Sequence, residues 1–313
     1  MKTGVTQCEY QGVKVYELVC GEMTVDVAPD DGMNICGIRY AGHTIVTVDP
    51  KRRASGGTWG MPVLYPTPNR ISASAAHFNG ETLPMIWQGK PLLMHGAARY
   101  MSFRVEQAEA QENCAVIRGF VDFVPGSDAY TYFPFHSRLT LEVRVYETRL
   151  EVTHTVENLD QKPLAFGLAY HPFFLKIGDT RFRTGARSYY ITDENKLPSG
   201  ELAPAEGIYD LSKPVSTEQV HLDHVYTQLP EGENSADIYY PDIHLHLALK
   251  ATPDFSHLVV FTPAGMPYFC LENQTCSTDC HNLSQHCDHT GLQIVDPGKH
   301  SCGTVTLEMG PMK

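Results

Sequence analysis

Apolar and polar residues alternate along much of the chain with the two-residue period of half-buried β-strands. The clearest stretch is 139–145, where Leu and Val occupy every second position, and 149–156 repeats the period. Only residues 146–148 separate the two stretches, a length typical of a hairpin. We therefore predict two adjacent antiparallel strands here.

Similar patterns recur elsewhere in the sequence. Alternation at 245–249 and 305–309 predicts further strands, and the denser apolar runs 115–124 and 257–261 predict strands covered on both faces. No segment has the spacing of an amphipathic helix longer than about two turns. Segment 197–220, rich in Pro, Ser and Glu, is predicted to be a long surface loop.

The distribution of turn residues bears on domain organisation. The 25 Gly and 21 Pro punctuate the chain every few residues instead of collecting in one linker. Strand patterns of similar character also flank segment 197–220 on both sides. We therefore predict an all-β protein, a large antiparallel sandwich that residues 1–313 form as a single domain.

Composition narrows the possible partners and the location. The formal charge is 24 − 36 = −12, which disfavours binding to nucleic acid or to an anionic membrane surface. No run of about 18 apolar residues predicts a membrane span, and the N-terminus lacks the apolar core of a signal peptide. Nine cysteines are an odd number without a disulfide-type pattern, so we expect reduced thiols and a cytoplasmic location.

A sandwich fold does not define a chemistry, so function must come from particular residues. Arg70 follows the rigid sequence Tyr-Pro-Thr-Pro-Asn, and its planar guanidinium offers five hydrogen-bond donors. His95 ends an apolar run and precedes Gly96, a residue that permits close approach of another group. Taken alone, these two residues are explained better as a surface arginine and a structural histidine than by a functional role.

Two further residues are unusual for their surroundings. His171 lies in an apolar run directly before a proline, where partial desolvation favours its neutral form. Glu272 follows four apolar residues, and a carboxylate is costly to bury unless it is paired or functional. A hydrogen-bonded core histidine and a buried salt bridge are the structural alternatives.

Together and in this order, five short segments resemble the aldose 1-epimerase (galactose mutarotase) family, and the resemblance spans about residues 10–310. The segments are Asn69-Arg70-Ile71, His95-Gly96, His171-Pro172-Phe173-Phe174, Leu222-Asp223-His224-Val225-Tyr226 and Cys270-Leu271-Glu272-Asn273-Gln274-Thr275. Each segment is weak evidence alone, whereas their shared order and spacing are specific.

The resemblance implies a β-supersandwich and the interconversion of the α and β anomers of a free aldohexose. It implies that Glu272 is the catalytic base and His171 the acid, with no metal ion or other cofactor. The implied substrate-binding residues, which would contact sugar hydroxyls, are Asn69, Arg70, His95 and Asp223. The surroundings of Asp223 look loop-like, and Asp237 and Asp242, which lie nearby in the sequence, are alternatives to it.

The sequence departs from the family pattern and leaves other functions open. Many members have Pro where this chain has Asn273, which affects the expected hydroxyl specificity and not the reaction type. Arg99 fits the pattern of a branch that acts on hexose 6-phosphates, where the arginine helps to hold phosphate. A sugar-binding module without catalysis would use the same hydroxyl-binding residues.

One further cluster of residues suggests a different kind of site. A structural zinc site would use residues of the kind gathered at Cys276, Cys280, His281, His286, Cys287 and His289. Their spacing is not a standard pairing of ligands, and nothing upstream supplies a second half of a site. We therefore expect an ordinary reduced loop here.

Overall fold

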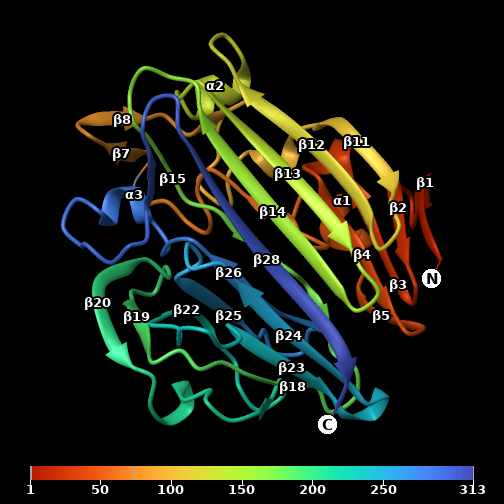
Figure 1. Cartoon of the computed structure of the whole chain (residues 1–313). Helices are drawn as coiled ribbons and strands as arrows, with labels where there is room; N and C mark the ends of the chain where they lie inside the picture. The colour runs from red at the N-terminus through yellow and green to blue at the C-terminus, as the bar shows by residue number, and fades with distance from the viewer. Residues whose placement is uncertain (1, 73, 313) are drawn as a thin grey trace.

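The computed structural model describes residues 2–72 and 74–312, which form two large antiparallel sheets (Figure 1). In these residues the first sheet has 13 strands. Its main path runs in the order β1 (Thr3–Tyr10), β2 (Val13–Cys20), β3 (Met23–Ala28), β4 (Asn34–Tyr40), β5 (His43–Val46), β17 (Phe174–Leu175), β26 (Tyr268–Gln274), β25 (His257–Phe261), β22 (Asp223–Thr227), β19 (Ser188–Thr192) and β20 (Pro198–Pro204). Beside this path, β16 (Ala169–Tyr170) pairs with both β26 and β6 (Val63–Leu64).

The second sheet forms a continuous band across the molecule in Figure 1. In the described residues it has nine strands. Their order is β11 (Arg104–Ala110), β12 (Ala115–Phe123), β13 (Ser137–Val145), β14 (Arg149–Asn158), β28 (His300–Pro311), β24 (Leu245–Ala251), β23 (Ala236–Tyr240), β18 (Arg181–Arg183) and β21 (Val215–Ser216).

Several small elements lie outside the two large sheets. Three strand pairs stand apart: β7 (Ala76–Phe78) with β8 (Glu81–Leu83), β9 (Ile86–Trp87) with β10 (Lys90–Pro91), and β15 (Leu164–Phe166) with β27 (Gln293–Val295). The α-helices found in the described chain are α1 (Pro50–Ala54), α2 (Asp128–Tyr132) and α3 (Cys280–Leu283), beside short 3₁₀ turns at Pro29–Asp31, Ala98–Tyr100, Gly207–Tyr209 and Pro241–Ile243. None of these helices has the length or apolarity that crossing a membrane requires.

The sheets pack face to face through the residues that produce the alternating pattern. Strands β12 and β13 contact β2, and β13 also contacts β3. Leu18 and Val25 of the first sheet belong to the same buried cluster as Leu139 and Val143 of the second. Burial of each such side chain stabilises the fold by about 1.5–3 kcal/mol. The structure thus confirms the predicted all-β sandwich.

The predicted strands agree closely with the observed ones. The hairpin of β13 and β14 pairs Leu139 with Val156 and Val145 with Leu150, as the period predicts. The patterns at 115–124, 245–249, 257–261 and 305–309 correspond to β12, β24, β25 and the second half of β28. The expectation that long helices are lacking is also met, since each α-helix of the described chain has four or five residues.

The prediction of a loop across 197–220 is wrong in its first part. Residues Pro198–Pro204 form β20, an edge strand that pairs with β19. The strand has only partly buried and exposed residues and lies at the end of the sheet. An edge strand that buries little surface does not need the apolar period on which the prediction relied. Its Pro, Ser and Glu residues therefore resembled those of a loop.

Candidate active site

The register of β26 brings His171 and Glu272 together. On one side of them Ala169 pairs with Gln274, and on the other side Phe174 pairs with Phe269. In one antiparallel register, the residue numbers of opposite residues always have the same sum. The two pairs share this sum, and residues 171 and 272 share it too. The register therefore puts residue 171 opposite residue 272. Two residues 101 positions apart in the sequence therefore face each other.

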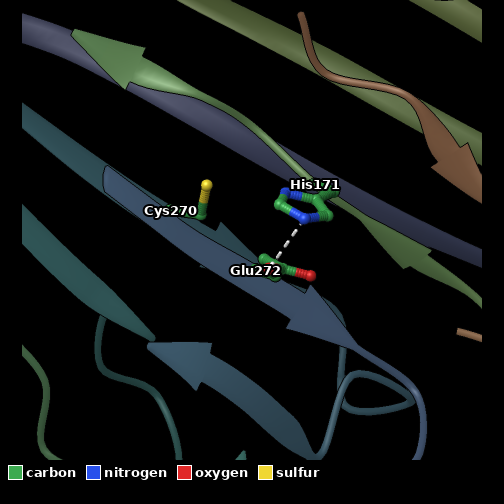
Figure 2. Close-up of side chains that lie close together, drawn as sticks. All are labelled: His171, Cys270 and Glu272. Atoms are coloured by element: carbon green, nitrogen blue, oxygen red, sulfur yellow. Dashed lines mark ion pairs between the residues drawn. The ribbon is translucent and has the colours of Figure 1, made fainter. Parts of the chain in front are cut away.

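The two side chains form a close, buried pair. His171 Nε2 lies 3.3 Å from Glu272 Oε1, and the side chains are only 7% and 2% exposed. Figure 2 shows the imidazole directed at the carboxyl group, with the Cys270 thiol beside them. His171 Nδ1 is buried and has no hydrogen-bond partner among the described residues. One proton can therefore pass between two groups that have little water around them.

Burial moves the pKa values of the pair in opposite directions. Burial raises the pKa of the Glu272 carboxyl well above its usual value, an effect that the hydrogen bond from Gln274 reduces. The pKa of His171 is lowered to about 3, first by burial and then by the nearby positive charges of Arg52 and Arg99. Both shifts favour the neutral forms, so the pair as a whole holds one proton that either partner can carry.

Two amide side chains, linked by a hydrogen bond, position the Glu272 carboxyl group. Gln274 Nε2 donates to Glu272 Oε2 at 3.1 Å, and Asn69 Nδ2 donates to Gln274 Oε1 at 3.1 Å. All three residues are buried. Asn69 thus acts within the protein framework here, whereas the resemblance implies contact with sugar. These two hydrogen bonds fix the plane of the Glu272 carboxyl group.

The Asn69-Arg70 and His95-Gly96 segments lie side by side. The backbone N–H of His95 donates to the carbonyl of Asn69 at 2.8 Å, and Arg70 and Met94 form an antiparallel bridge. A Cβ atom on Gly96 would come within 2.2 Å of the carbonyl oxygen of Tyr65, so only glycine fits at this position. The close approach predicted at Gly96 is therefore made by the protein backbone.

Arg70 and Asp223 form an ion pair near the catalytic candidates. Arg70 Nη2 lies 3.6 Å from Asp223 Oδ2, and about a third of each side chain is exposed. Asp223 begins β22 and pairs with Phe261, so its surroundings are a strand and not the expected loop. Asp237 is engaged elsewhere, by Arg183 and His246 in the second sheet. The geometry therefore favours Asp223 as the acidic residue at this site.

Aromatic rings and a second arginine complete the surroundings of His171. Its ring stacks on Phe173 with centroids 4.5 Å apart and meets the His95 ring edge-on at 5.3 Å. The Arg52 guanidinium lies over Phe173 at 4.7 Å and donates to the Tyr268 hydroxyl at 2.9 Å. The structure therefore brings His95 and His171 together.

A cavity of about 440 Å³ is lined in part by Arg53, Trp59, Arg99 and Tyr100, and none of the predicted catalytic or substrate-binding residues lines it. It reaches Pro62, whose carbonyl accepts the backbone N–H of His171. The Nε atom of Arg99 is buried and has no partner among the described residues. The cavity therefore combines the guanidinium groups of Arg53 and Arg99 with aromatic surface and with the carboxylate of Asp31.

The Cys/His-rich segment does not gather three ligands at one point. His171, Cys270 and Glu272 are the one set of three or more His, Cys, Asp or Glu residues in the described chain whose ligand atoms lie within metal-binding reach of one another. In the segment itself, Cys276 and Cys280 are buried, whereas His286 and His289 are exposed. The expectation of an ordinary loop remains a prediction.

The sequence analysis missed the roles of Gln274, Arg52 and Cys270. The sequence does contain a signal for Gln274 and Cys270, because side chains two residues apart on a strand point to the same face. Once β26 is recognised as a strand, Cys270, Glu272 and Gln274 fall on one face. Arg52 lay outside every motif, and its place follows from helix α1, which Asp49 caps through the N–H groups of Lys51 and Arg52.

The two packed antiparallel sheets form a galactose mutarotase-like β-sandwich. A model of the aldose 1-epimerase family matches residues 43–308. The chain therefore belongs to the aldose 1-epimerase family, which supports an epimerase or mutarotase role.

Solved structures share the whole fold at low sequence identity. A galactose mutarotase-like protein from Clostridium acetobutylicum superposes with a TM-score of 0.88 at 19% identity, over 99% of each chain. Galactose 1-epimerase from Lactobacillus acidophilus NCFM superposes with a TM-score of 0.78 at 16% identity, over 100% of this chain and 99% of that one. In sequence, the uncharacterized protein YphB of Escherichia coli K12 is 25% identical over 186 residues, which are 56% of this chain and 61% of that protein.

Proposed function

We propose that the protein interconverts the α and β anomers of an aldohexose by opening and reclosing the sugar ring. The observation that carries this proposal is the buried pair of His171 Nε2 and Glu272 Oε1, 3.3 Å apart. Ring opening needs a base at the anomeric hydroxyl and an acid at the ring oxygen. A protein that only binds sugar has no use for two titratable groups buried together.

Glu272 is the proposed base and His171 the proposed acid. Glu272 takes the proton of the anomeric hydroxyl while His171 gives its Nε2 proton to the ring oxygen, and the C1–O5 bond breaks to leave an aldehyde. Rotation about C1–C2 exposes the other carbonyl face, and the reverse steps close the ring. The cycle requires that His171 and Glu272 together carry one exchangeable proton. The lowered pKa of His171 and the raised pKa of Glu272 favour this state.

The resting pair resembles the ring-opened stage of this cycle. Burial favours neutral His171 and protonated Glu272, the forms that exist after the first proton transfers. Bound sugar must therefore stabilise the alternative arrangement, in which the proton is on His171. Arg70, Asp223 and His95 surround the pair and are the proposed contacts for sugar hydroxyls, and these contacts also hold the open chain for reclosure.

A phosphorylated aldohexose is a second candidate substrate, favoured by the cavity at Arg53 and Arg99. The buried Arg99 Nε has an unused donor, and a guanidinium suits a phosphate group. The carbonyl of Gly56, 3.5 Å away, is a long contact for Arg99 Nη1. A phosphate could thus replace weak backbone contacts with charged ones.

A comparison of substrates tests these proposals. Crystalline single-anomer glucose and galactose, and glucose 6-phosphate displaced from anomeric equilibrium, are followed by polarimetry or NMR with and without the protein. We expect faster equilibration of at least one of them. If Arg99→Ala selectively slows the phosphorylated sugar, the second candidate holds; if only free sugars respond, the first holds. Equal rates with and without protein for every sugar would refute both.

A further inference from the structure

We propose that His171, Cys270 and Glu272 form an inhibitory Zn²⁺ site within the proposed catalytic centre. Cys270 has no part in the proton transfers, yet it is fully buried beside them. The ligand atoms of the three residues all lie within 4.8 Å of one another. An imidazole nitrogen, a thiolate and a carboxylate are the ligands that zinc uses in proteins.

The geometry is close to that of a tetrahedral zinc site. With zinc–ligand distances of about 2.0–2.3 Å, neighbouring ligand atoms lie roughly 3.3–3.7 Å apart. The separation of His171 Nε2 and Glu272 Oε1 is 3.3 Å, so these two atoms already have the required spacing. Cys270 and Glu272 alternate on β26, which directs both side chains to the same face. Small side-chain movements would bring the three atoms around one ion.

Charge balance also suits a buried ion. Burial keeps the Cys270 thiol and the Glu272 carboxyl protonated in the free protein, so binding of Zn²⁺ would displace both protons to solvent. The resulting thiolate and carboxylate each carry one negative charge and the imidazole is neutral, so the three ligands would neutralise Zn²⁺. A neutral complex avoids the high cost of burying an unpaired charge. The fourth position stays open for water or for an oxygen atom of the sugar.

The surroundings distinguish a reversible inhibitor from a resident cofactor. A metal-binding histidine in a permanent site usually donates its second nitrogen to an acceptor, which orients the ring. His171 Nδ1 is buried without such a partner in the described chain, whereas Glu272 Oε2 does have its hydrogen bond from Gln274. Glu272 therefore has a hydrogen bond that would orient it as a ligand, whereas His171 lacks one. This difference fits weak, exchangeable binding of the metal.

Inhibition follows from the shared ligands. Zinc would occupy the nitrogen of His171 and the oxygen of Glu272 that are proposed to move protons, so sugar and metal would compete. This consequence rests on the proposed function, but binding of the metal does not. A test therefore needs one measurement of activity and one of binding alone.

The test titrates the metal-free full-length protein with Zn²⁺ by calorimetry, and with Co²⁺ by absorption spectroscopy, while a parallel series measures mutarotation against added Zn²⁺. We expect inhibition relieved by sugar, and a thiolate-to-cobalt charge-transfer band in the near ultraviolet. Cys270→Ala should need at least about 10-fold more Zn²⁺ to lose half of its own zinc-free activity, since even indirect partners of metal ligands change affinity by about 10–100-fold.

Cys287→Ala is the matched control, because the Cys287 thiol lies 3.4 Å from His289 Nε2 at a second Cys/His contact. This variant should respond to Zn²⁺ like the wild type. Equal zinc sensitivity of Cys270→Ala and wild type, or a wild-type protein without the cobalt band, would overturn the proposal. If Cys270→Ala does not fold, Cys270→Ser and the wild-type cobalt spectrum decide. A cobalt band that depends on Cys270, in a protein that equilibrates no sugar, would refute the function and leave the metal site standing.

Discussion

Gln274 Nε2 donates a hydrogen bond to Glu272 Oε2, which leaves Oε1 as the oxygen that faces His171. Because Oε2 already accepts a hydrogen bond from the Gln274 amide, a proton bound to the carboxyl group resides on Oε1. Gln274 is itself held by Asn69 and is fully buried, so this orientation is fixed by the fold. The relationship gives the proposed proton transfer a defined direction.

Gln274→Met should therefore impair turnover more than binding. The substitution removes both hydrogen bonds with little change in volume, and a hydrogen bond to a charged group contributes about 1.5–3 kcal/mol. We expect kcat to fall by roughly 10–100-fold with a small change in KM. Since the Gln274 hydrogen bond lowers the pKa of Glu272, its loss should move the alkaline limb of the pH–rate profile to higher pH. An unchanged profile would contradict this positioning role.

The two proposed catalytic residues should behave as one unit. Glu272→Gln cannot accept the anomeric proton, and His171→Asn cannot carry a proton near neutral pH. Each substitution should reduce kcat by at least about 100-fold while sugar binding changes far less. The double variant should lose much less than the product of the two single losses, because both residues serve one proton relay. Multiplicative losses in steady-state kinetics would mean that the residues act independently.

Arg70→Ala should weaken substrate binding as well as turnover. Its guanidinium is partly exposed beside Asp223 and is proposed to hold hydroxyl groups before and during the reaction, so KM should rise together with a fall in kcat. Arg181→Ala is the control, because Arg181 pairs with Asp179 on the exposed surface at 2.6 Å. Steady-state kinetics of both variants provides the check. A similar effect of the two substitutions would point to a general loss of charge or stability.

Buried histidines should make the protein sensitive to acid. Burial lowers the pKa values of four of them to about 3 or 4, and these are His154, His171, His257 and His281. Between pH 6.5 and about 4 the unfolded chain binds protons that the folded chain excludes, so the free energy of unfolding falls as the pH falls. Glu272 has the opposite sign: its raised pKa reduces stability as the pH rises above the usual carboxyl value.

His154→Leu isolates this effect away from the site. Both ring nitrogens of His154 are buried without a partner in the described chain, a situation that typically costs about 1–3 kcal/mol. Thermal unfolding at pH 7 and pH 5 should show a smaller loss on acidification than in the wild type. His300→Leu, at an exposed position, is the control and should leave the difference unchanged. An equal acid sensitivity of His154→Leu and wild type would contradict the assignment.

The sequence predicted what depends on local periodicity and missed what depends on register. Strand β13 could be recognised because Leu139 to Val145 bury one face, whereas the edge strand β20 buries too little to show a period. His171 and Glu272 stood out as polar residues in apolar runs. Their contact depends on the pairing of segments 101 residues apart, which no local pattern encodes. Asn69 was expected to touch sugar, but its contact with Gln274 follows from the same long-range pairing.

The most direct test of the central claim is the optical rotation of freshly dissolved α-galactose and α-glucose with wild-type protein and with Glu272→Gln. Both proteins are used at equal concentration, with a chelator present so that stray zinc does not interfere. We predict that the wild type speeds the approach to the equilibrium rotation and that Glu272→Gln, shown to be folded by circular dichroism, is slower by at least about 100-fold. Equal acceleration by the two proteins would mean that the buried pair is not the catalytic base and acid.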